Sequence, residues 1–377
     1  MGIGEALSVK TIHDSIYGSI DLDERVSRII ETREFQRLNS VRQLGFTYLV
    51  FPGATHTRFE HSLGTYHLST EASRNLALGE KSSLLISLAG LLHDIGHTPF
   101  SHSLEDATVE LYGKDHLDIS LDIIEGKTEG NEIADVLGDL KGDISRILRG
   151  MGGILSRLIS GNGDLDQIDY LARDSYYTGV ALGAVDIPRI LKVLAVEGNE
   201  LCILEKGLPA IEGLMVARML MYRTVYRHRT ALIASTIANR AAVEMNPEYE
   251  EFIRWNDSDF MCALRERKPD VYETLKYRRL PRGVLVSVDE REFREIVSSL
   301  GDILFSHQYF KSPFKREILK IKTEEGVRPI TDFSLVMKFL ERELEGLGLL
   351  VFQRENEDAV KEKLKSLNIN DLHGKMI

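Results

Sequence analysis

The chain has 377 residues, of which 43% are hydrophobic and 28% charged, and its formal net charge is −11. This length is enough for one large core with a smaller appended unit, and the acidic balance argues against a protein that follows a nucleic-acid backbone. No apolar run approaches the roughly 20 residues that a membrane-spanning helix needs, so we expect no membrane association.

The first half of the chain is predicted to form a short β-hairpin followed by helices. Residues 8–22 alternate between apolar and polar side chains around Tyr17-Gly18, which favours a turn. From Glu24 onward apolar residues recur at helical spacing, and Pro52-Gly53 marks a turn between helices. Further helices are predicted at residues 57–78, 82–95, 101–112, 116–125, 131–138, 164–178 and 187–196.

The second half mixes helices with short strands. Residues 210–245 carry apolar residues at helical spacing over a length that fits either one long helix or two. Strands are predicted at residues 200–204, 283–288, 314–322 and 349–352, and helices at residues 332–346 and 358–367. We therefore predict a mainly α fold, with a helical core and its helical extension at residues 1–308 and a small α+β subdomain at residues 309–377.

Four residues of metal-ligand type lie in three of the segments that are predicted as helices. They are His61, His93, Asp94 and Asp166. Two imidazoles and two carboxylates form a mixed nitrogen and oxygen ligand set, which suits a catalytic divalent metal rather than a structural thiolate site. This set points to hydrolysis of a phosphate ester.

The adjacent pair His93-Asp94 restricts where such a metal could lie. Neighbouring residues on a helix diverge by about 100°, so both can reach one ion only beside a helix end, where Gly96 would stop the turn. The alternative is a buried helix end at which a histidine precedes a capping aspartate. Two further imidazoles, His97 and His102, follow within nine residues, and an apolar helix does not need them, so we favour the metal site.

Several motifs then occur together: FQRL at residues 35–38, RQLG at 42–45, FPGATHTRFEHSLG at 51–64, LLHDIGHTPFSH at 91–102 and DYLARD at 169–174. In this combination the chain resembles the HD-domain metal-dependent phosphohydrolases, and among them the deoxynucleoside triphosphate triphosphohydrolases typified by the vertebrate SAM- and HD-domain protein. A looser match continues through residues 218–228, and no SAM-like module is expected. The resemblance implies a helical HD core whose metal ligands are the four residues named above.

The resemblance also implies a set of catalytic residues. His102 matches a family histidine near the α-phosphate and the leaving 5′-oxygen, where an imidazolium could act as general acid with Glu105 holding it charged. His116 matches a second family histidine, although Leu117 stands where family members often carry Glu. His97 is expected to line the same pocket. The alternative for each histidine is an ordinary surface or helix-cap residue.

Substrate contacts are implied in the same way. Gln43 and Leu44 align with residues that pack against the deoxyribose. Arg58 precedes His61 by three residues, so both lie on one helical face, and it is expected to pair with substrate phosphates.

Two further helical faces are candidate walls of the substrate site. Tyr170 and Asp174 follow Asp166 at i+4 and i+8, so one face could offer an aromatic edge and an acceptor for a sugar hydroxyl. A second face has the same spacing and could meet a terminal phosphate and the sugar. Its members are Arg218, Tyr222 and Tyr226. Ordinary core tyrosines and a paired or solvated arginine are the alternative.

Two departures from the family pattern affect the substrate and its regulation. Gln167 occupies the position of a phosphate-binding Lys, so one positive charge is missing at this substrate position. Asn39 and Glu31 stand where nucleotide-activated members carry Arg and Asp that read a guanine base. We therefore predict no strict dependence on a guanine-nucleotide activator.

The function expected from these motifs is hydrolysis of a dNTP to a deoxynucleoside and triphosphate, with a divalent ion that could be Mg, Mn, Fe, Ni or Zn. The alternatives are a nucleotidase or phosphodiesterase on other phosphate esters, and a nucleotide-binding regulatory protein. A nucleotide is the expected partner, and the resemblance implies a homo-oligomer, a dimer or a tetramer. Cys202 and Cys262 form no CxxC pair, so we expect reduced thiols in a cytoplasmic protein without a signal peptide.

Overall fold

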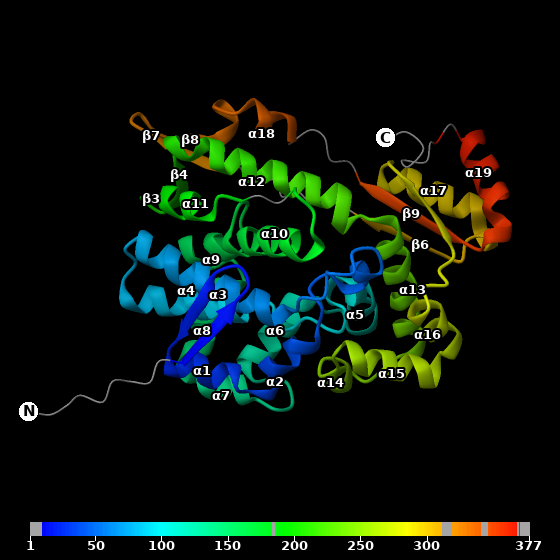
Figure 1. Ribbon diagram of the computed structural model, residues 1–377, viewed down its shortest axis with the longest axis horizontal. Helices are drawn as coiled ribbons and strands as arrows, with labels where there is room; N and C mark the ends of the chain where they lie inside the picture. The colour runs from blue at the N-terminus through cyan, green and yellow to red at the C-terminus, as the bar shows by residue number, and fades with distance from the viewer. Residues whose placement is uncertain (1–9, 183–184, 311–318, 341–345, 368, 370–377) are drawn as a thin grey trace, which may run out of the picture.

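The computed structural model describes residues 10–182, 185–310, 319–340, 346–367 and 369. These residues form the mainly α fold that was predicted, with small β elements at the N-terminus and in the second half (Figure 1). The N-terminal hairpin is confirmed: β1 (Lys10–Asp14) pairs with β2 (Gly18–Leu22) in antiparallel register and lies against α3. None of the described helices is both long enough and apolar enough to cross a bilayer.

Two long helices form the centre of the first half. α3 (Arg58–Asn75) and α4 (Glu80–Leu92) pack along each other, and α10 (Leu165–Thr178) packs on α3. The start of α3 is fixed by the Glu60 carboxylate, which accepts hydrogen bonds from the backbone N–H (2.6 Å) and hydroxyl (3.0 Å) of Thr57. The other predicted helices of this half are present as α5 (Glu105–Tyr112), α6 (His116–Glu125), α7 (Glu132–Leu137) and α11 (Ile187–Val193).

Several boundaries and elements differ from the prediction. α4 ends at Leu92 and not at residue 95, so His93 and Asp94 lie at the helix end. Residues 101–104 form a 3-10 turn before α5, and residues 194–196, predicted as helix, belong to β3. The helical segment predicted from Glu24 onward contains α1 (Glu24–Ile30) and α2 (Arg33–Gln36). Helices that were not predicted are α8 (Lys141–Leu148), α9 (Ile154–Ile159), α14 (Tyr249–Phe252), α15 (Asp257–Arg267), α16 (Pro269–Lys276) and α17 (Glu290–Leu300).

Gly96 has a different role from the expected turn. Its φ is not positive, and a Cβ there would lie 2.2 Å from the backbone N of Ser120 and 2.3 Å from the carbonyl O of His116. Glycine is therefore required because the backbone of α6 approaches the chain directly after the His93-Asp94 pair.

The apolar stretch at residues 210–245 is two helices. α12 (Leu208–Met221) passes into a π-helical turn at Tyr222–Tyr226, and α13 (Arg229–Met245) follows. In Figure 1 two small sheets lie near opposite ends of α12. In the four-stranded sheet the order is β3 (Leu194–Glu197), β4 (Glu200–Leu204), β7 (Lys320–Thr323) and β8 (Gly326–Pro329).

The second sheet has three antiparallel strands, with β9 (Leu347–Phe352) between β5 (Arg282–Val286) and β6 (Ser306–Phe310). All six residues of β9 are buried because helices cover both faces of the sheet. Leu349 and Val351 pack on the α13 side, whereas Leu350 and Phe352 pack with α17 and α19 (Glu357–Ser366).

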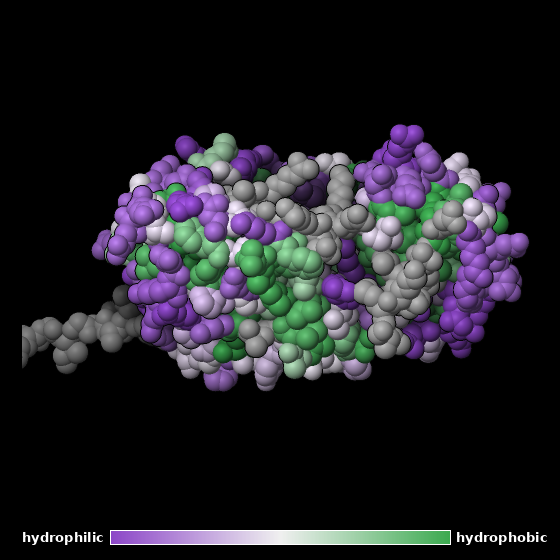
Figure 2. Space-filling model, turned by 90° about the horizontal axis from the view of Figure 1, so that it is seen from above, coloured by the Kyte–Doolittle hydropathy of each residue, from purple (hydrophilic) through white to green (hydrophobic). Residues whose placement is uncertain are grey.

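The C-terminal region contributes to both sheets. Strands β7 and β8 extend the sheet of β3 and β4, and α18 (Leu335–Leu340) packs on α12, whereas β9 and α19 join β5, β6 and α17. The boundary predicted between residues 308 and 309 falls inside β6. Parts of the predicted strand at 314–322 and helix at 332–346, residues 314–318 and 341–345, lie outside the described residues, as do residues 8 and 9 of the predicted hairpin. Figure 2 shows polar side chains over both ends of one face, with an apolar area between them.

Candidate metal centre

The four predicted ligand residues meet at one point. His61 lies in the first turn of α3, His93 and Asp94 follow the end of α4, and Asp166 lies in the first turn of α10. The Nε2 atom of His61 is 3.3 Å from Nε2 of His93 and 3.3 Å from Oδ2 of Asp94. Oδ1 of Asp166 is 3.0 Å from Nε2 of His61 and 3.6 Å from Nε2 of His93. Residues more than 100 positions apart in the chain therefore share one small volume.

The protonation of the two imidazoles fits a cation at this point. Nδ1 of His61 lies 2.7 Å from Oδ2 of Asp169, and Nδ1 of His93 lies 2.8 Å from the carbonyl O of Gly90. Both partners only accept, so each Nδ1 carries the proton and the two Nε2 lone pairs face each other. Metal–ligand bonds of about 2.0–2.2 Å put neighbouring ligand atoms roughly 3–3.5 Å apart, which is the spacing found here. His61, His93 and Asp94 form a candidate metal-binding cluster, and Asp166 adjoins it through its contacts with both histidines.

The electrostatics of this cluster favour positive charge. Burial lowers the pKa of His61, but its contacts with Asp166, Asp169 and Asp94 outweigh this effect and raise the pKa well above its usual range. Burial raises the pKa of Asp166, but hydrogen bonds to His61 and His93 lower it below its usual range. A metal ion and a proton therefore compete for the same place.

A buried charge network, which was not predicted, orients His61. Asp169 accepts from Arg173 Nε (2.9 Å) and Nη2 (2.8 Å), and Arg173 Nη1 donates to Oδ2 of Asp14 at 2.8 Å. Arg173 is fully buried, and its charge lowers the pKa of Asp169 against the raising effect of desolvation. A carboxylate on the distal nitrogen of a ligand histidine fixes its tautomer and ring orientation. The signal in the sequence was the i, i+3 and i+7 spacing of Asp166, Asp169 and Arg173, the last two within the DYLARD motif.

Gly64 makes room for this network. A Cβ at Gly64 would lie 1.9 Å from Oδ1 of Asp169 and 2.3 Å from Nη2 of Arg173. The glycine of the HSLG motif is therefore needed so that α10 can bring Asp169 to His61.

Arg58 lies beside the cluster in a different arrangement from the predicted one. Its Nη1 forms a short hydrogen bond with Oδ2 of Asp94, and its Nε donates to Oγ of Ser101 at 2.8 Å. The side chain is 3% exposed. In this structure Arg58 neutralises a candidate ligand, and its contact with substrate phosphates stays a prediction.

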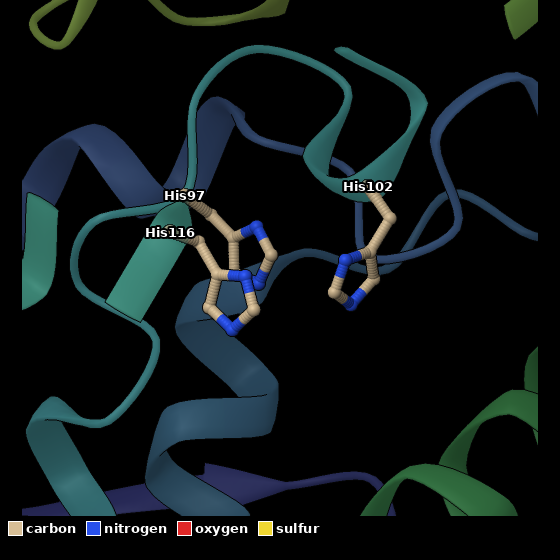
Figure 3. Close-up of side chains that lie close together, drawn as sticks. All are labelled: His97, His102 and His116. Carbon is tan, nitrogen blue, oxygen red and sulfur yellow. The ribbon is translucent and has the colours of Figure 1, made fainter. Parts of the chain in front are cut away.

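A second cluster contains three histidines and adjoins the first. Figure 3 shows His97 and His116 side by side with His102 across from them. The rings of His97 and His116 are parallel, with centroids 4.2 Å apart, and His102 is edge-on to both. Nε2 of His97 lies 3.4 Å from Oδ1 of Asp94 and has no hydrogen-bond partner among the described residues. The two clusters are therefore in contact through Asp94.

Glu105 joins two of these histidines. One carboxylate oxygen lies 2.7 Å from Nδ1 of His102, and the other forms a short hydrogen bond with Nδ1 of His116. Burial lowers the pKa of His116, but the hydrogen bond and charge of Glu105 outweigh it and raise the pKa above its usual value. His97, His102 and His116 each place a ring nitrogen within 4.8 Å of the others, so this group could also hold a metal ion. The pairing of Glu105 with His102 and His116 equally suits proton transfer.

The predicted sugar contacts lie near the start of η2 (Gly45–Leu49). Gln43 is 6% exposed, its backbone N–H donates to the carbonyl O of His56 (3.0 Å), and its Oε1 lacks a partner among the described residues. Leu44 is the residue before η2 and packs against the main core. An unsatisfied buried amide oxygen is compatible with a ligand contact at Gln43.

The side-chain amide of Gln167 forms hydrogen bonds with the loop just before α10. Its Nε2 donates to the carbonyl O of Gly161 (2.7 Å) and to Oδ2 of Asp164 (3.2 Å), and its Oε1 accepts from the backbone N–H of Gly163 (3.1 Å). The amide therefore fastens the loop that leads into α10. Its predicted substrate contact stays a prediction without support from this geometry.

The two predicted substrate walls meet each other. The ring of Tyr170 lies edge-on to Tyr226 at 6.0 Å, and the hydroxyl of Tyr226 donates to Oδ2 of Asp174 (2.7 Å). Tyr222 also contacts the ring of Tyr226 at 5.0 Å, and the Arg218 guanidinium lies 5.7 Å from the ring centre of Tyr222. The π-helical turn at Tyr222–Tyr226 brings these rings together, and such turns are frequent at functional sites.

His56, which was not predicted, completes this wall. Its Nε2 lies 2.7 Å from Oδ1 of Asp174, and its ring stacks on Tyr177 at 4.6 Å. Both oxygens of Asp174 are therefore already engaged, by His56 and by Tyr226. The sequence signal was the position of His56 within the FPGATHTRFEH motif.

Comparison with known proteins gives the family. The model of the HD domain matches residues 58–174, and that of the HD associated region matches residues 185–300. An uncharacterized protein of Methanocaldococcus jannaschii is 32% identical, over 97% of this chain and 82% of its own length. The deoxynucleoside triphosphate triphosphohydrolase SAMHD1 homolog of Dictyostelium discoideum is 28% identical over 71% of this chain, and the SAMHD1 triphosphohydrolase of Gallus gallus is 29% identical over 75%. The chain spans 57% and 55% of these two proteins, a little over half of their length.

Solved structures agree with the family models. A hypothetical protein from Aquifex aeolicus has a TM-score of 0.81 and 28% identity, over 94% of this chain and all of that chain. A phosphohydrolase from Bacteroides thetaiotaomicron has a TM-score of 0.77 and 27% identity, over 92% of this chain and all of that one. Because the family models, relatives along nearly the whole chain and these structures agree, the chain belongs to the HD-domain metal-dependent phosphohydrolases.

Proposed function

We propose that this phosphohydrolase converts a deoxynucleoside triphosphate and water to a deoxynucleoside and inorganic triphosphate. The observation that carries the proposal is the contact between the metal cluster and the histidine cluster through Asp94, which puts a candidate acid next to a candidate divalent-metal site. The relatives named as dNTP triphosphohydrolases support the same substrate class. The proposed ligands are His61, His93, Asp94 and Asp166, and the ion could be Mg, Mn, Fe, Ni or Zn.

Each cluster then has a chemical task. The cluster of His61, His93, Asp94 and Asp166 would hold a divalent ion, which would supply an activated water and neutralise charge on the phosphate under attack. The water oxygen bonds to the α-phosphorus, the bond from phosphorus to the 5′-oxygen breaks, and the leaving oxygen takes a proton. His102 suits this last step because its side chain is 59% exposed, and the Glu105 carboxylate balances its positive charge.

The buried histidines are proposed to support this step. His97 is 1% exposed and lies between Asp94 and the stacked ring of His116. In this position its Nε2 atom can form a hydrogen bond with a phosphate oxygen, because that atom has no other hydrogen-bond partner among the described residues. His116 is held by Glu105 and keeps that carboxylate in place between the two rings.

The sugar pocket is proposed at the wall formed by Tyr170, Asp174 and Tyr226, with Gln43 and Leu44 on its other side. Asp174 already accepts from Tyr226, so a sugar hydroxyl would either share that oxygen or displace the tyrosine hydroxyl. An unsatisfied Gln43 oxygen offers a second acceptor.

The test is a product analysis. Protein loaded separately with Mg, Mn, Fe, Ni or Zn is incubated with each dNTP, and the products are separated by chromatography. The expected products are deoxynucleoside and triphosphate in equal amounts, and release of dNMP or orthophosphate alone contradicts the proposal. His102→Gln should abolish turnover without loss of metal, whereas His307→Gln, an exposed histidine on β6, should leave turnover unchanged.

A second candidate substrate class has one observation in its favour. The Gln167 amide is bonded to the loop at residues 161–164 and offers no positive charge to a triphosphate. A nucleotidase or phosphodiesterase acting on a less charged ester needs no such charge. A panel of nucleoside monophosphates, cyclic nucleotides and a chromogenic phosphate diester, assayed beside the dNTPs, distinguishes the two classes. The expected homo-oligomer and cytoplasmic location stay predictions.

A further inference from the structure

The loop that connects the two clusters contains a strained turn. Among the residues that the structure describes, six that are not glycine have positive φ, and only Phe100 and Ser101 are adjacent, each with φ of 55°. Two of the other four are Asn, which tolerates this conformation, and the remaining two are exposed. Phe100 and Ser101 are both 1% exposed. A buried pair of left-handed residues persists only where surrounding contacts hold it.

The contacts of Phe100 come from the second half of the chain and from η2. Its backbone N–H donates to Oδ1 of Asp257, the first residue of α15, at 2.7 Å. Its ring stacks in parallel on Phe46, with centroids 4.2 Å apart, and meets Phe260 edge-on at 6.0 Å. Residues of the HD-associated region therefore hold the backbone and one side of the ring.

Asp257 acts as a clamp on this turn. Its other oxygen, Oδ2, accepts from the backbone N–H of Arg42 (3.2 Å) and from Nη1 of Arg42 (3.1 Å). Ser101 is bonded to the same residue, since its Oγ donates to the carbonyl O of Arg42 at 2.7 Å. The buried carboxylate of Asp257, 3% exposed, thus joins the strained turn to the RQLG segment.

The other end of the loop is fastened to the same region. Nη1 of Arg37 donates to the carbonyl O of His97 (2.7 Å) and to that of Trp255 (3.2 Å), and Nη2 donates to the carbonyl O of Ile95 (2.8 Å). The loop from residue 95 to residue 101 is therefore held at both ends by the segment at residues 255–257, directly at one end and through Arg37 at the other.

The consequence concerns His102, the residue after the turn. In Figure 3 it lies opposite His97 and His116, and residues 98–101 form the chain segment that leads from His97 to it, while Glu105 holds its ring from the other side. We propose that Asp257 is a positioning residue that holds Phe100 and Ser101 in the left-handed conformation and thereby places His102 beside the metal cluster. This inference rests on the proposed function only where it is tested by a change in kcat.

The main experiment compares Asp257→Asn with Asp259→Asn in the full chain. Asp259 is a matched control because it lies two residues from Asp257 on the same helix, is exposed, and accepts a hydrogen bond from the N-cap backbone N–H of Asn256 (2.9 Å). Asp257→Asn should lower kcat by about 10–100-fold, with KM changed by less than about threefold and bound metal unchanged. Asp259→Asn should keep wild-type kcat.

A readout without substrate makes the inference independent of the proposed function. Hydrogen–deuterium exchange of the peptide at residues 96–104 should become faster in Asp257→Asn, because the Phe100 amide loses its charged acceptor, and should stay unchanged in Asp259→Asn. If Asp257→Asn does not fold, Phe46→Leu replaces it as the test variant. It removes the stacked ring and keeps the carboxylate, and it should also make exchange of this peptide faster and lower kcat.

The outcomes separate the two proposals. Unchanged exchange with unchanged kcat overturns the positioning role, and so does a fall in kcat that is matched by loss of bound metal. If wild-type protein hydrolyses no phosphate ester, the proposed function fails, and the exchange result alone then decides whether Asp257 holds the turn.

Discussion

Replacing Gly64 by alanine tests whether the approach of α10 to α3 supports the metal centre. In an ordinary helix this substitution stabilises the fold by about 1 kcal/mol, because alanine loses less backbone entropy. Here the added Cβ would lie 1.9 Å from Oδ1 of Asp169 and 2.3 Å from Nη2 of Arg173. The Asp169–Arg173 pair must then move or break.

The expected magnitude follows from the burial of that pair. Both side chains are fully buried, and leaving one partner of such a pair uncompensated costs roughly 3–5 kcal/mol. After the helix gain of about 1 kcal/mol, Gly64→Ala should destabilise the protein by about 2–4 kcal/mol. Because Asp169 also holds Nδ1 of His61, metal affinity should fall by about 10–100-fold.

The assay is urea unfolding of metal-free and Mn-loaded protein, with metal affinity measured by calorimetry. Gly213→Ala is the matched control, since Gly213 lies inside α12 and an added Cβ there meets nothing within 4 Å. The control should gain stability and keep its metal affinity. If Gly64→Ala behaves like Gly213→Ala in both measurements, the argument from the Asp169–Arg173 pair is wrong.

Three other predictions address the ligands, the acid and the buried clamp. Asp166→Asn, like chelation of the metal, should abolish hydrolysis and bound metal while circular dichroism stays native. Glu105→Gln should lower kcat by about 10–100-fold and move the alkaline limb of the pH profile to lower pH, because the imidazolium form loses its counter-charge. Burial raises the pKa of Asp257 to about 6. The backbone N–H groups of Phe100 and Arg42 and the positive charges of Arg42 and Arg37 lower this pKa but do not outweigh burial. The folded state then binds this proton more tightly than the unfolded state, so wild-type stability should fall by about 2–3 kcal/mol as pH rises from about 4 to above 6. Urea unfolding of Asp257→Asn across this range should lack that loss, and parallel curves for both proteins would contradict it.

The convergence of the four ligand residues was predictable because each lies in a short motif with a definite local structure. His93 and Asp94 could share an ion only at a helix end, and the end of α4 at Leu92 supplies it. What the motifs could not give is the set of partners that come from distant positions. Arg173 and Asp14 are 159 residues apart, and nothing local to either residue indicates the other.

The direction of a side chain was equally beyond the sequence. Gln167 was assigned to the substrate site because it occupies the position of a phosphate-binding Lys in the family that the chain resembles. Its amide nitrogen instead donates to Gly161 and Asp164, because a helix start offers unpaired groups nearby. The spacing of residues along a helix predicts which face a side chain occupies. Which hydrogen-bond partners its polar atoms take depends on the donors and acceptors nearby.

The two sheets show how tertiary pairing divides a segment that looks continuous in the sequence. Residues after Tyr309 were predicted to form one α+β subdomain, yet β7 pairs with β4 as well as with β8, and β9 pairs with β5 and β6. A central strand buried on both faces, such as β9, needs two neighbours and two covering helices, and only earlier parts of the chain provide them. The C-terminal segment therefore completes the region that contains Asp257 and α13, and α13 in turn packs against the 3-10 turn at residues 101–104, which contains His102. The stability of the three-stranded sheet and the position of His102 are thus linked through packed helices, although no residue of that sheet belongs to the metal cluster or to the histidine cluster.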